Sequence, residues 1–424
     1  MPFRIALSGL NAAQTDLSVN GNNIANSSTA GFKRSRTEFG DIFAVAFEGI
    51  SNIATGNGVG INAVAQNFSQ GNIDFTDRSL DIAISGQGFM VTKDNTGVAY
   101  TRAGAFHIDR DGNVVNQNAE KLQIFEAISG GGFNTGKLTN LELSTTEGAP
   151  SATANIDVAV NLSSSAAGIA ADGTLIDPTN ATTFNNSTST VVYDSLGTAH
   201  TATFYYAKSN VTDNEWYSRL YIDDVLVKPD VVAGLPALDP DYNTMTFGTD
   251  GKILTPVGGV VAYNVFDPTT GTPSTGAADI TLSTSYANAT QFGSPFAVNG
   301  LSQDGYGTGR LSGIDIDDEG VVFARYTNGQ SNPLGKLALA TFSNLGGLRQ
   351  LGNSSWAQSF EAGDVVLGEA GTSSFGFVQS GGLESSNVDI AESLVNLITA
   401  QRNFQANAQV ISAADTITQT IINI

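Results

Sequence analysis

Both ends of this 424-residue chain carry an apolar heptad pattern, although the long stretch between them is rich in Gly, Ser, Thr and Asn and has short, strand-like alternating runs. Apolar residues spaced three and four apart form one stripe along an α-helix, as in a coiled-coil seam. We therefore expect an α+β multidomain protein with paired N- and C-terminal coiled-coil-like helices and nested all-β domains. The predicted seam residues are Phe3, Leu7, Leu10, Leu17 and Ile24 near the start and Ile390, Leu394, Leu397, Phe404 and Ile411 near the end.

The two seams are too weak to stabilise each other as an isolated pair. Ordering the backbone costs about 1–2 kcal/mol per residue, whereas burying a large apolar side chain returns about 1.5–3 kcal/mol. Gln14, Gly21, Gln401 and Asp415 interrupt the stripes and lower that return. We expect the helices to obtain the missing burial from other copies of the chain. The alternative is that two amphipathic helices pack on the chain's own globular core.

Local signals mark the ends of both helices. The first helix is expected over residues 3–26, because a cluster of Asn, Ser, Thr and Gly follows it. Ser386 and Asp389 have the spacing of a capping box ahead of the last helix.

Changes of pattern between the helices predict nested β domains. From about residue 72 the apolar residues tend to recur at every second position, as in β-strands. Asp109 to Gly112 is expected to form a hairpin turn between two of these strands. A similar turn at residues 318–320 places both strand groups in one split domain. The expected organisation is terminal helices at 1–31 and 386–424 forming an inner polymerisation domain, an extended connector at 32–71, a discontinuous inner β domain at 72–150 and 290–368, an inserted outer β domain at 151–289, and a Gly/Ser-rich linker at 369–385.

Composition excludes several functional classes. The chain has no cysteine, which rules out disulfides and thiolate chemistry. Its formal charge of −21 argues against nucleic-acid binding, which needs a basic face. No stretch approaches the roughly 20 apolar residues of a membrane span, so no membrane insertion is expected. The first residues also lack the basic, apolar and small-residue regions of a cleaved secretory signal.

No constellation in the sequence supports catalysis, a cofactor or a metal centre. Residues 131–137 match a phosphate-binding loop until Leu138, which replaces the expected Ser or Thr, and no helix pattern follows. The Asp-rich stretches that begin at Asp109 and Asp315 are better explained as hairpin turns than as calcium loops, although weak calcium binding is left open. His107 and His200 share no ligand-spaced neighbour. The expected catalytic, cofactor and metal residues are therefore none.

Several motifs in a fixed order resemble the family of bacterial flagellar rod and hook proteins. They cover both ends and the predicted inner β domain. The N-terminal signature comprises Asn22, Asn23, Ile24, Ala25, Asn26, Gly31, Phe32 and Lys33. The other matching stretches are residues 8–13, 80–89, 100–106, 383–389 and 392–411.

This resemblance implies a structural role and not an enzymatic one. Because the predicted outer domain is missing from rod subunits of the family, the resemblance implies a hook subunit that polymerises into a curved, flexible tube and transmits torque from rod to filament. It further implies an extracellular flagellar location, export through the flagellar apparatus without a cleaved signal peptide, and contacts with many sister copies, rod proteins, a hook cap and junction proteins. The alternatives are a distal-rod subunit and, from another class, a secreted acidic adhesin or surface-layer protein.

Overall fold

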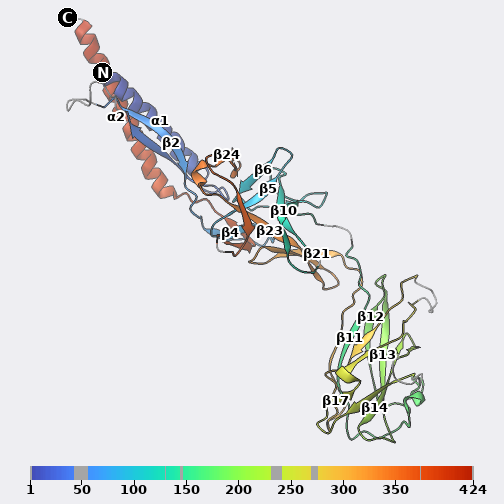
Figure 1. Cartoon of the computed structure of the whole chain (residues 1–424). Helices are drawn as coiled ribbons and strands as arrows, with labels where there is room; N and C mark the ends of the chain where they lie inside the picture. Colours follow the sequence, from blue (N-terminus) through green and yellow to red (C-terminus); the bar gives the residue numbers. More distant parts are fainter. Residues whose placement is uncertain are drawn as a thin grey trace. The chain divides into compact units, whose positions relative to one another are not determined.

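The computed structural model describes residues 2–42, 56–128, 130–143, 147–230, 241–268, 276–372 and 374–422, and has an α+β fold with a helix near each end and β-sheets between them (Figure 1). The chain divides into two compact units. Unit 1 comprises Met1–Thr145, Ser312–Arg325 and Ser331–Ile424, and unit 2 comprises Thr146–Leu311 and Tyr326–Gln330. Unit 2 is thus inserted into the chain of unit 1.

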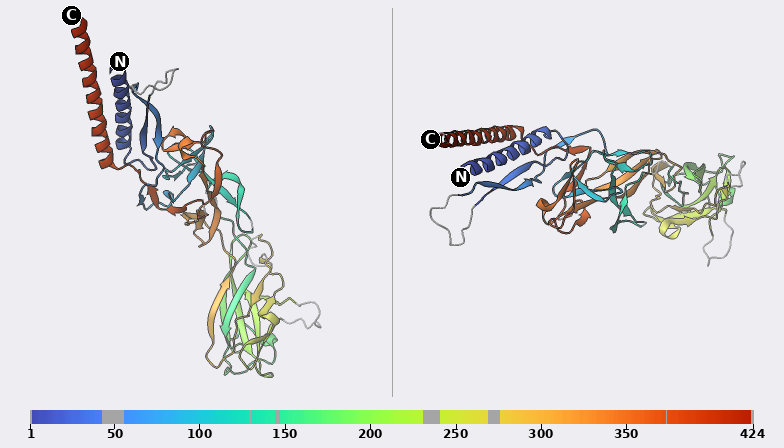
Figure 2. Two further views of the ribbon diagram at one scale, coloured as in Figure 1. Left: turned by 60° about the vertical axis from the view of Figure 1, so that its left-hand side comes forward. Right: turned by 90° about the horizontal axis from the view of Figure 1, so that it is seen from above.

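Two long helices, α1 (Pro2–Ala25) and α2 (Ile390–Ile422), lie side by side in unit 1 (Figures 1 and 2). The predicted bounds of the first helix are confirmed to within one residue. At the start of α2, Asp389 Oδ1 accepts the backbone N–H of Glu392 at 3.1 Å. The capping-box prediction needs correction, because Asp389 itself is the cap and Ser386 lies outside the helix, where its hydroxyl accepts the N–H of Val388.

Residues expected to form an extended connector contain a β-hairpin that packs on α1. Strands β1 (Ser35–Asp41) and β2 (Val59–Gln66) pair antiparallel. The Ser8 hydroxyl of α1 accepts the N–H of Val59 at 3.2 Å. Helix α1 therefore has α2 on one side and the hairpin on another (Figure 2).

The β part of unit 1 is built around one large sheet of order β21-β22-β23-β9-β5-β6-β25-β24. Its core includes Phe89, Phe125 and Trp356, and the expected hairpin turn at Asp109 to Gly112 joins β7 to β8. The strands of unit 1 after the hairpin are β3 (Ile73–Phe75), β4 (Ile82–Ser85), β5 (Phe89–Lys93), β6 (Val98–Thr101), β7 (His107–Ile108), β8 (Val114–Val115), β9 (Lys121–Ala127), β10 (Phe133–Asn140), β21 (Leu311–Ile316), β22 (Val321–Tyr326), β23 (Ser331–Thr341), β24 (Arg349–Gly352), β25 (Ser355–Ala357), β26 (Val366–Glu369), β27 (Phe377–Ser380) and β28 (Gly382–Glu384).

The segment 369–385, expected to be a Gly/Ser-rich linker, is a paired part of unit 1. Strand β27 pairs with β4, and β28 pairs with β3. Glycine content suggested a linker, but these backbones hydrogen-bond in register and the Glu384 side chain is fully buried. The segment therefore fastens α2 to the β part of the unit.

Unit 2 contains two sheets that share one core. The first has the order β18-β19-β11-β20, and the second has the order β12-β13-β14-β16-β17 with β15 paired to β14. Buried side chains from both sheets, including Val158, Phe204 and Trp216, form a single cluster. The strands are β11 (Asn155–Asn161), β12 (Asn186–Tyr193), β13 (Ala199–Lys208), β14 (Glu215–Ile222), β15 (Val225–Val227), β16 (Asn243–Phe247), β17 (Ile253–Thr255), β18 (Val260–Ala262), β19 (Ser283–Ser285) and β20 (Ala297–Gln303).

The boundary expected at residue 290 needs correction, because residues 290–311 belong to unit 2. Strand β20 pairs with β11 of unit 2 along its whole length. Asp304, just after β20, accepts the N–H groups of Ala154 and Asn155. Pattern changes alone did not reveal this pairing, because β20 is mostly exposed and has no strong alternation.

Candidate assembly surface and its anchor

None of the ten predicted seam residues is fully buried in the single chain. Leu10, Leu17, Ile24, Leu397, Phe404 and Ile411 are half-buried, and Phe3, Leu7, Ile390 and Leu394 are between 41% and 50% exposed. The fully buried positions of the two helices are instead small or polar. They are Ala6, Ala12, Ala13, Asn20, Asn23, Ser393 and Ala400.

The two helices approach each other closely at a glycine. A Cβ atom on Gly9 of α1 would lie 2.6 Å from Oδ1 of Asn407 in α2, closer than any side-chain methyl tolerates. The apolar pattern of the sequence did not identify Gly9 as a contact point. An apolar stripe predicts which side chains a helix buries. The close approach of α1 and α2 depends instead on the absence of a side chain at Gly9.

Large apolar side chains remain exposed on both helices and on the hairpin. Neither helix combines the length and apolarity needed to cross a membrane, judged over the described residues. An exposed apolar face on helices that do not span a membrane is typical of a protein–protein interface. The exposed side chains are Phe3, Ile5 and Leu7 on α1, Phe39, Ile42, Ile61 and Val64 on or beside the hairpin, and Ile390, Leu394, Val395, Ile398, Val410 and Ile417 on α2.

The N-terminal signature residues form the exit from α1. Asn23 Nδ2 donates to the carbonyl of Ser35 at 2.7 Å, and Asn23 Oδ1 accepts the N–H of Ser35 at 2.9 Å, which fixes the start of the hairpin against the helix. Asn26 Oδ1 accepts the hydroxyl of Thr29 in the turn that follows. Asn23, Gly31, Phe32 and Lys33 are buried, Ile24 and Asn26 are half-buried, and Asn22 and Ala25 are exposed.

Gly31 is required by both its backbone conformation and its surroundings. Its φ is +68°, in the left-handed region. A Cβ there would lie 2.5 Å from the backbone nitrogen of Ala103. The Gly31 N–H donates to the carbonyl of Glu384 at 2.7 Å, which joins the end of α1 to the strand that precedes α2.

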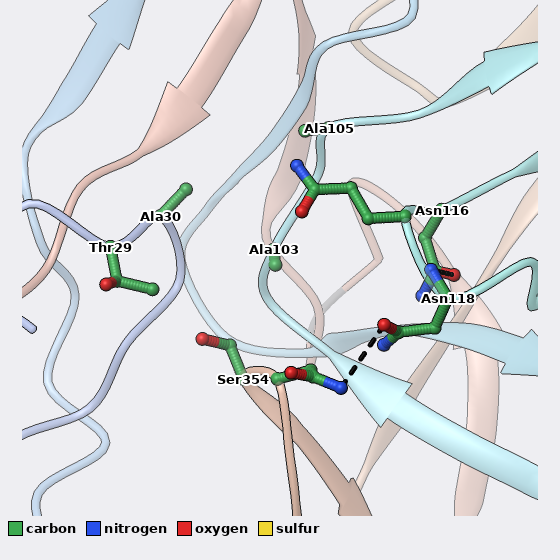
Figure 3. A pocket seen from close by; sticks show the side chains of 9 residues that line it. Thr29, Ala30, Ala103, Ala105, Asn116, Asn118 and Ser354 are labelled. Carbon is green, nitrogen blue, oxygen red and sulfur yellow. Dashed lines mark hydrogen bonds between the residues drawn. The ribbon is translucent and has the colours of Figure 1, made fainter.

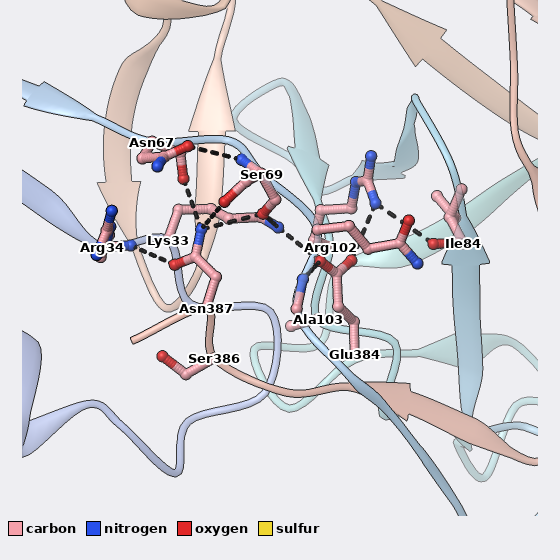
Figure 4. A network of polar contacts seen from close by, with 12 residues as sticks. Lys33, Arg34, Asn67, Ser69, Ile84, Arg102, Ala103, Glu384, Ser386 and Asn387 are labelled. Carbon is pink, nitrogen blue, oxygen red and sulfur yellow. Dashed lines mark hydrogen bonds and ion pairs between the residues drawn. The ribbon is translucent and has the colours of Figure 1, made fainter. Parts of the chain in front are cut away.

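A buried ion cluster connects three segments that are far apart in the sequence (Figure 4). The Glu384 carboxylate accepts from Lys33 Nζ at 2.6 Å and from Arg102 Nη1 at 2.9 Å, and it also accepts the N–H of Gly71. The Lys33, Arg102 and Glu384 side chains are 1%, 5% and 0% exposed. Lys33, Arg102 and Glu384 each lie in one of the motif stretches identified in the sequence.

Neutral acceptors complete the cluster, which holds two cations and one anion. Lys33 Nζ donates to the carbonyl of Ser69 at 2.8 Å, and Arg102 Nη2 donates to the carbonyl of Gly86 at 2.8 Å. The Arg102 guanidinium also lies 5.4 Å from the centre of the Phe89 ring. Burial lowers the pKa of Lys33, and the charge and hydrogen bond of Glu384 oppose that shift.

Asn387 provides a second bridge beside the ion cluster. Its Oδ1 accepts the N–H of Arg34 at 2.8 Å, and its Nδ2 donates to the carbonyls of Asn67 and Ser69 (Figure 4). Glu384 and Asn387 lie in the motif at residues 383–389, but the sequence alone predicted no role for either residue. The available signal was the presence of Glu384 and Arg102 within motifs made mostly of apolar or small residues. Charged side chains are rarely buried unless paired, so this pattern could have indicated a buried ion pair.

The candidate chemical motifs have structural explanations in the described residues. Residues 133–137 of the glycine-rich stretch lie in strand β10. Asp315 pairs with Arg325, and His200 Nδ1 contacts Asp223 at 2.6 Å. Across the parts of the chain that the structure describes, no group of three acidic or histidine side chains converges as metal ligands would.

Asp194 illustrates how the acidic residues of unit 2 stabilise its turns. Its Oδ1 accepts the N–H groups of Leu196 and Thr198 at 2.9 and 2.8 Å. Burial raises the pKa of Asp194, but these N–H donors together outweigh burial, and the net shift is downward.

Comparison of the chain with known proteins shows the family to which it belongs. The description "Flagella basal body rod protein" matches residues 3–33, "Flagellar hook protein FlgE/F/G D1 domain" matches 83–176, "Flagellar basal body protein FlaE D2 domain" matches 161–306, and "Flagellar basal body rod FlgEFG protein C-terminal" matches 379–424. The flagellar hook protein FlgE of Escherichia coli is 36% identical over 433 residues, which cover 100% of both chains. That of Borreliella burgdorferi is 31% identical and covers 99% of this chain and 98% of its own.

A solved structure with low sequence identity to this chain has a similar fold. The flagellar hook protein FlgE2 of Helicobacter pylori superposes with a TM-score of 0.51 over 74% of this chain and 100% of its own, at 14% identity. Its likeness supports the α+β multidomain class.

Proposed function

Because the chain belongs to the flagellar hook protein family, we propose that it is a structural subunit that polymerises into the curved, flexible tube joining rod to filament and transmits motor torque through it. The full-length relatives are hook proteins, so the alternatives of a distal-rod subunit and of a secreted adhesin or surface-layer protein are not supported. The proposed role is mechanical, and the family is a structural one. The location is the flagellum.

The exposed apolar face of the helices carries this proposal. In the single chain Leu394, Val395 and Ile398 of α2 are 45%, 62% and 48% exposed, although they lie on an ordered helix. Burying one such side chain completely is worth about 1.5–3 kcal/mol. Helices of neighbouring copies would supply that burial, and the half-buried seam residues would then form a coiled-coil-like contact between α1 and α2 within a tight inner layer.

The buried ion cluster suits a subunit that transmits force. Lys33 follows α1, Glu384 precedes α2, and Arg102 belongs to the β part of unit 1. Load that enters through the helices would pass into the β-sheets through charge-assisted hydrogen bonds, which are about twice as strong as neutral ones. The same cluster would keep the helical layer and the β unit rotating together.

The proposal extends to partners and delivery. Many sister copies would form the tube, with rod proteins at one end, junction proteins at the other, and a hook cap over the growing tip. The flagellar export apparatus would deliver the chain without cleavage of a signal peptide. Weak polar contacts between copies of unit 2 would permit the protofilaments to shorten and lengthen as the tube bends.

Electron microscopy of the assembled full-length protein tests the central claim. We expect curved tubes from the unmodified protein and no tubes from the double variant Leu394→Asp/Ile398→Asp, because its charges would enter the contact between copies. The matched control is Gln405→Glu, an exposed polar position on the same helix, and it should still assemble. Circular dichroism should show an unchanged monomer for each variant. Straight rods, or tubes from the Asp variant, would contradict the proposal.

A further inference from the structure

Asparagine followed by glycine is a chemically reactive pair. The backbone nitrogen of the glycine can attack the amide carbon of the asparagine side chain, which closes a five-membered imide and releases ammonia. Water then opens the imide to aspartate or to isoaspartate, whose main chain is one carbon longer. Glycine favours the attack because it carries no side chain to hinder ring closure. The chain contains four such pairs, which begin at Asn20, Asn57, Asn299 and Asn328.

The pair at Asn328 shows how the fold protects such a site. Asn328 Nδ2 donates to the carbonyl of Gly307 at 2.8 Å, and Asn328 Oδ1 accepts the N–H of Gln330 at 3.1 Å. The attacking nitrogen is also engaged, because the N–H of Gly329 donates to the carbonyl of Tyr326 at 3.0 Å. Ring closure therefore requires these hydrogen bonds to break first.

Other asparagines are restrained in comparable ways. Asn20 is buried within α1, and its Nδ2 donates to the carbonyl of Asp16 at 2.9 Å. Asn299 lies in β20, and its two neighbours in the chain both pair with β11. Beside a recess of unit 1, Asn353 Nδ2 donates to Asn118 Oδ1 at 3.2 Å (Figure 3). Neither Asn118 nor Asn353 is followed by glycine.

Asn57 lies just before β2 and is not restrained in this way. Its side chain is exposed and forms no hydrogen bond with any residue that the structure describes. The N–H of Gly58 likewise has no acceptor within the described part of the chain. Gly58 is itself favoured by the fold, because its φ is +112° and a Cβ there would collide with Oγ of Ser8 in α1. Close packing of the hairpin on α1 thus retains the glycine that makes Asn57 reactive.

We propose that Asn57 deamidates spontaneously, mainly to isoaspartate, and that the modification loosens the β1–β2 hairpin from α1. The asparagine amide and one water give a carboxylate and ammonium, so the reaction needs no other co-reactant. It takes place in the single chain and does not depend on assembly.

The extra main-chain carbon would enter beside the hydrogen bonds that hold this end of the hairpin. The N–H of Asn57 donates to the carbonyl of Ile42 at 2.7 Å, and the N–H of Ile42 donates to the carbonyl of Gly58 at 2.9 Å. The next residue, Val59, donates its N–H to Ser8 Oγ of α1 at 3.2 Å. A longer main chain between residues 57 and 58 would shift these groups relative to one another and weaken the attachment to α1.

Peptide mass spectrometry of the monomeric full-length protein, incubated for days at neutral pH and physiological temperature, tests the modification. Trypsin places the four pairs in separate peptides, 5–33, 37–78, 253–310 and 326–336. We expect exchange of amide for acid at Asn57 to be at least about 30-fold faster than at Asn328; this ratio corresponds to about 2 kcal/mol, two hydrogen bonds of about 1 kcal/mol each. Asn57→Gln, whose longer side chain closes a ring far more slowly, should stay unmodified. Equal rates at Asn57 and Asn328, or a faster rate at any other pair, would overturn the inference.

Amide hydrogen exchange of the same samples measures the structural consequence. In chains that carry isoaspartate, the N–H of Val59 should exchange about fivefold faster than in fresh protein, since one hydrogen bond contributes about 1 kcal/mol. Incubated Asn57→Gln should show no change. Fresh Asn57→Asp adds the charge without the extra carbon and should exchange at the original rate. Unchanged exchange in the isoaspartate form, or the same increase in Asn57→Asp, would refute the loosening of the hairpin.

Discussion

The buried carboxylate of Glu384 offers the most direct test of how the terminal helices are held. Glu384→Gln keeps the shape of the side chain but removes the negative charge that lies 2.6 Å from Lys33 and 2.9 Å from Arg102. Two buried cations would then face only neutral acceptors. Removing one partner of a buried ion pair costs about 3–5 kcal/mol. For a unit of this size each kcal/mol lowers Tm by about 2–4 °C, so we expect a fall of about 6–20 °C.

Differential scanning calorimetry of the monomeric full-length protein measures this effect as a shift of the unit 1 transition. The matched control is Glu392→Gln, which removes the exposed ion pair between Glu392 and Arg34 at 2.7 Å. Exposed pairs contribute about 0–1 kcal/mol, so the control should shift Tm by less than about 4 °C. Adding Lys33→Met to Glu384→Gln should recover part of the loss, because it removes one unpaired cation. Equal shifts for the two Gln variants would refute the reasoning.

Further substitutions probe three other features of the structure: Gly31, the approach of the two helices at Gly9, and Asp194. Gly31→Ala should destabilise unit 1 by at least about 2 kcal/mol in a denaturant titration, because its φ is +68° and a Cβ would meet backbone atoms; Gly21→Ala, with nothing within 4 Å, should instead stabilise α1 by about 0.5–1 kcal/mol. Gly9→Val should separate the helices and lower the disulfide-crosslinking rate of cysteines placed across them, and Asn407→Ala should restore part of it; an unchanged rate in Gly9→Val would contradict the close approach. The folded-state pKa of Asp194 lies below the ordinary 3.8, so its stabilisation is present above that value and is lost as pH falls through the lowered pKa. The unit 2 melt should therefore depend less steeply on pH below the ordinary pKa of an Asp in Asp194→Asn, and identical pH profiles would count against this role.

The spacing of apolar residues was enough to predict helices and strands in which buried and exposed side chains alternate regularly. The helix at Pro2–Ala25 and the β7–β8 hairpin follow from apolar spacing and turn residues, and the structure confirms both. In each of these cases neighbouring residues in the sequence determine the local structure.

The features that sequence reasoning missed depend on pairing between distant segments. The strands at Phe377–Ser380 and Gly382–Glu384 lie in a stretch rich in Gly and Ser that was expected to be a linker, because only pairing with residues 73–85 makes them strands. The buried role of Glu384 was equally invisible, since its two cationic partners lie 351 and 282 residues away. The proposed roles of the seam residues remain predictions, because their burial depends on other copies.

The separation of Lys33 from Glu384 by 351 residues has a consequence for the order in which the chain matures. A polypeptide that emerges with its first residue in the lead holds the Lys33 ammonium in water until nearly the entire sequence has appeared. Only then does the carboxylate arrive, and closure over so long a loop is slow compared with local folding. A chain that ends before residue 384 therefore lacks the carboxylate, and Lys33 and Arg102 then have no anionic partner in this cluster.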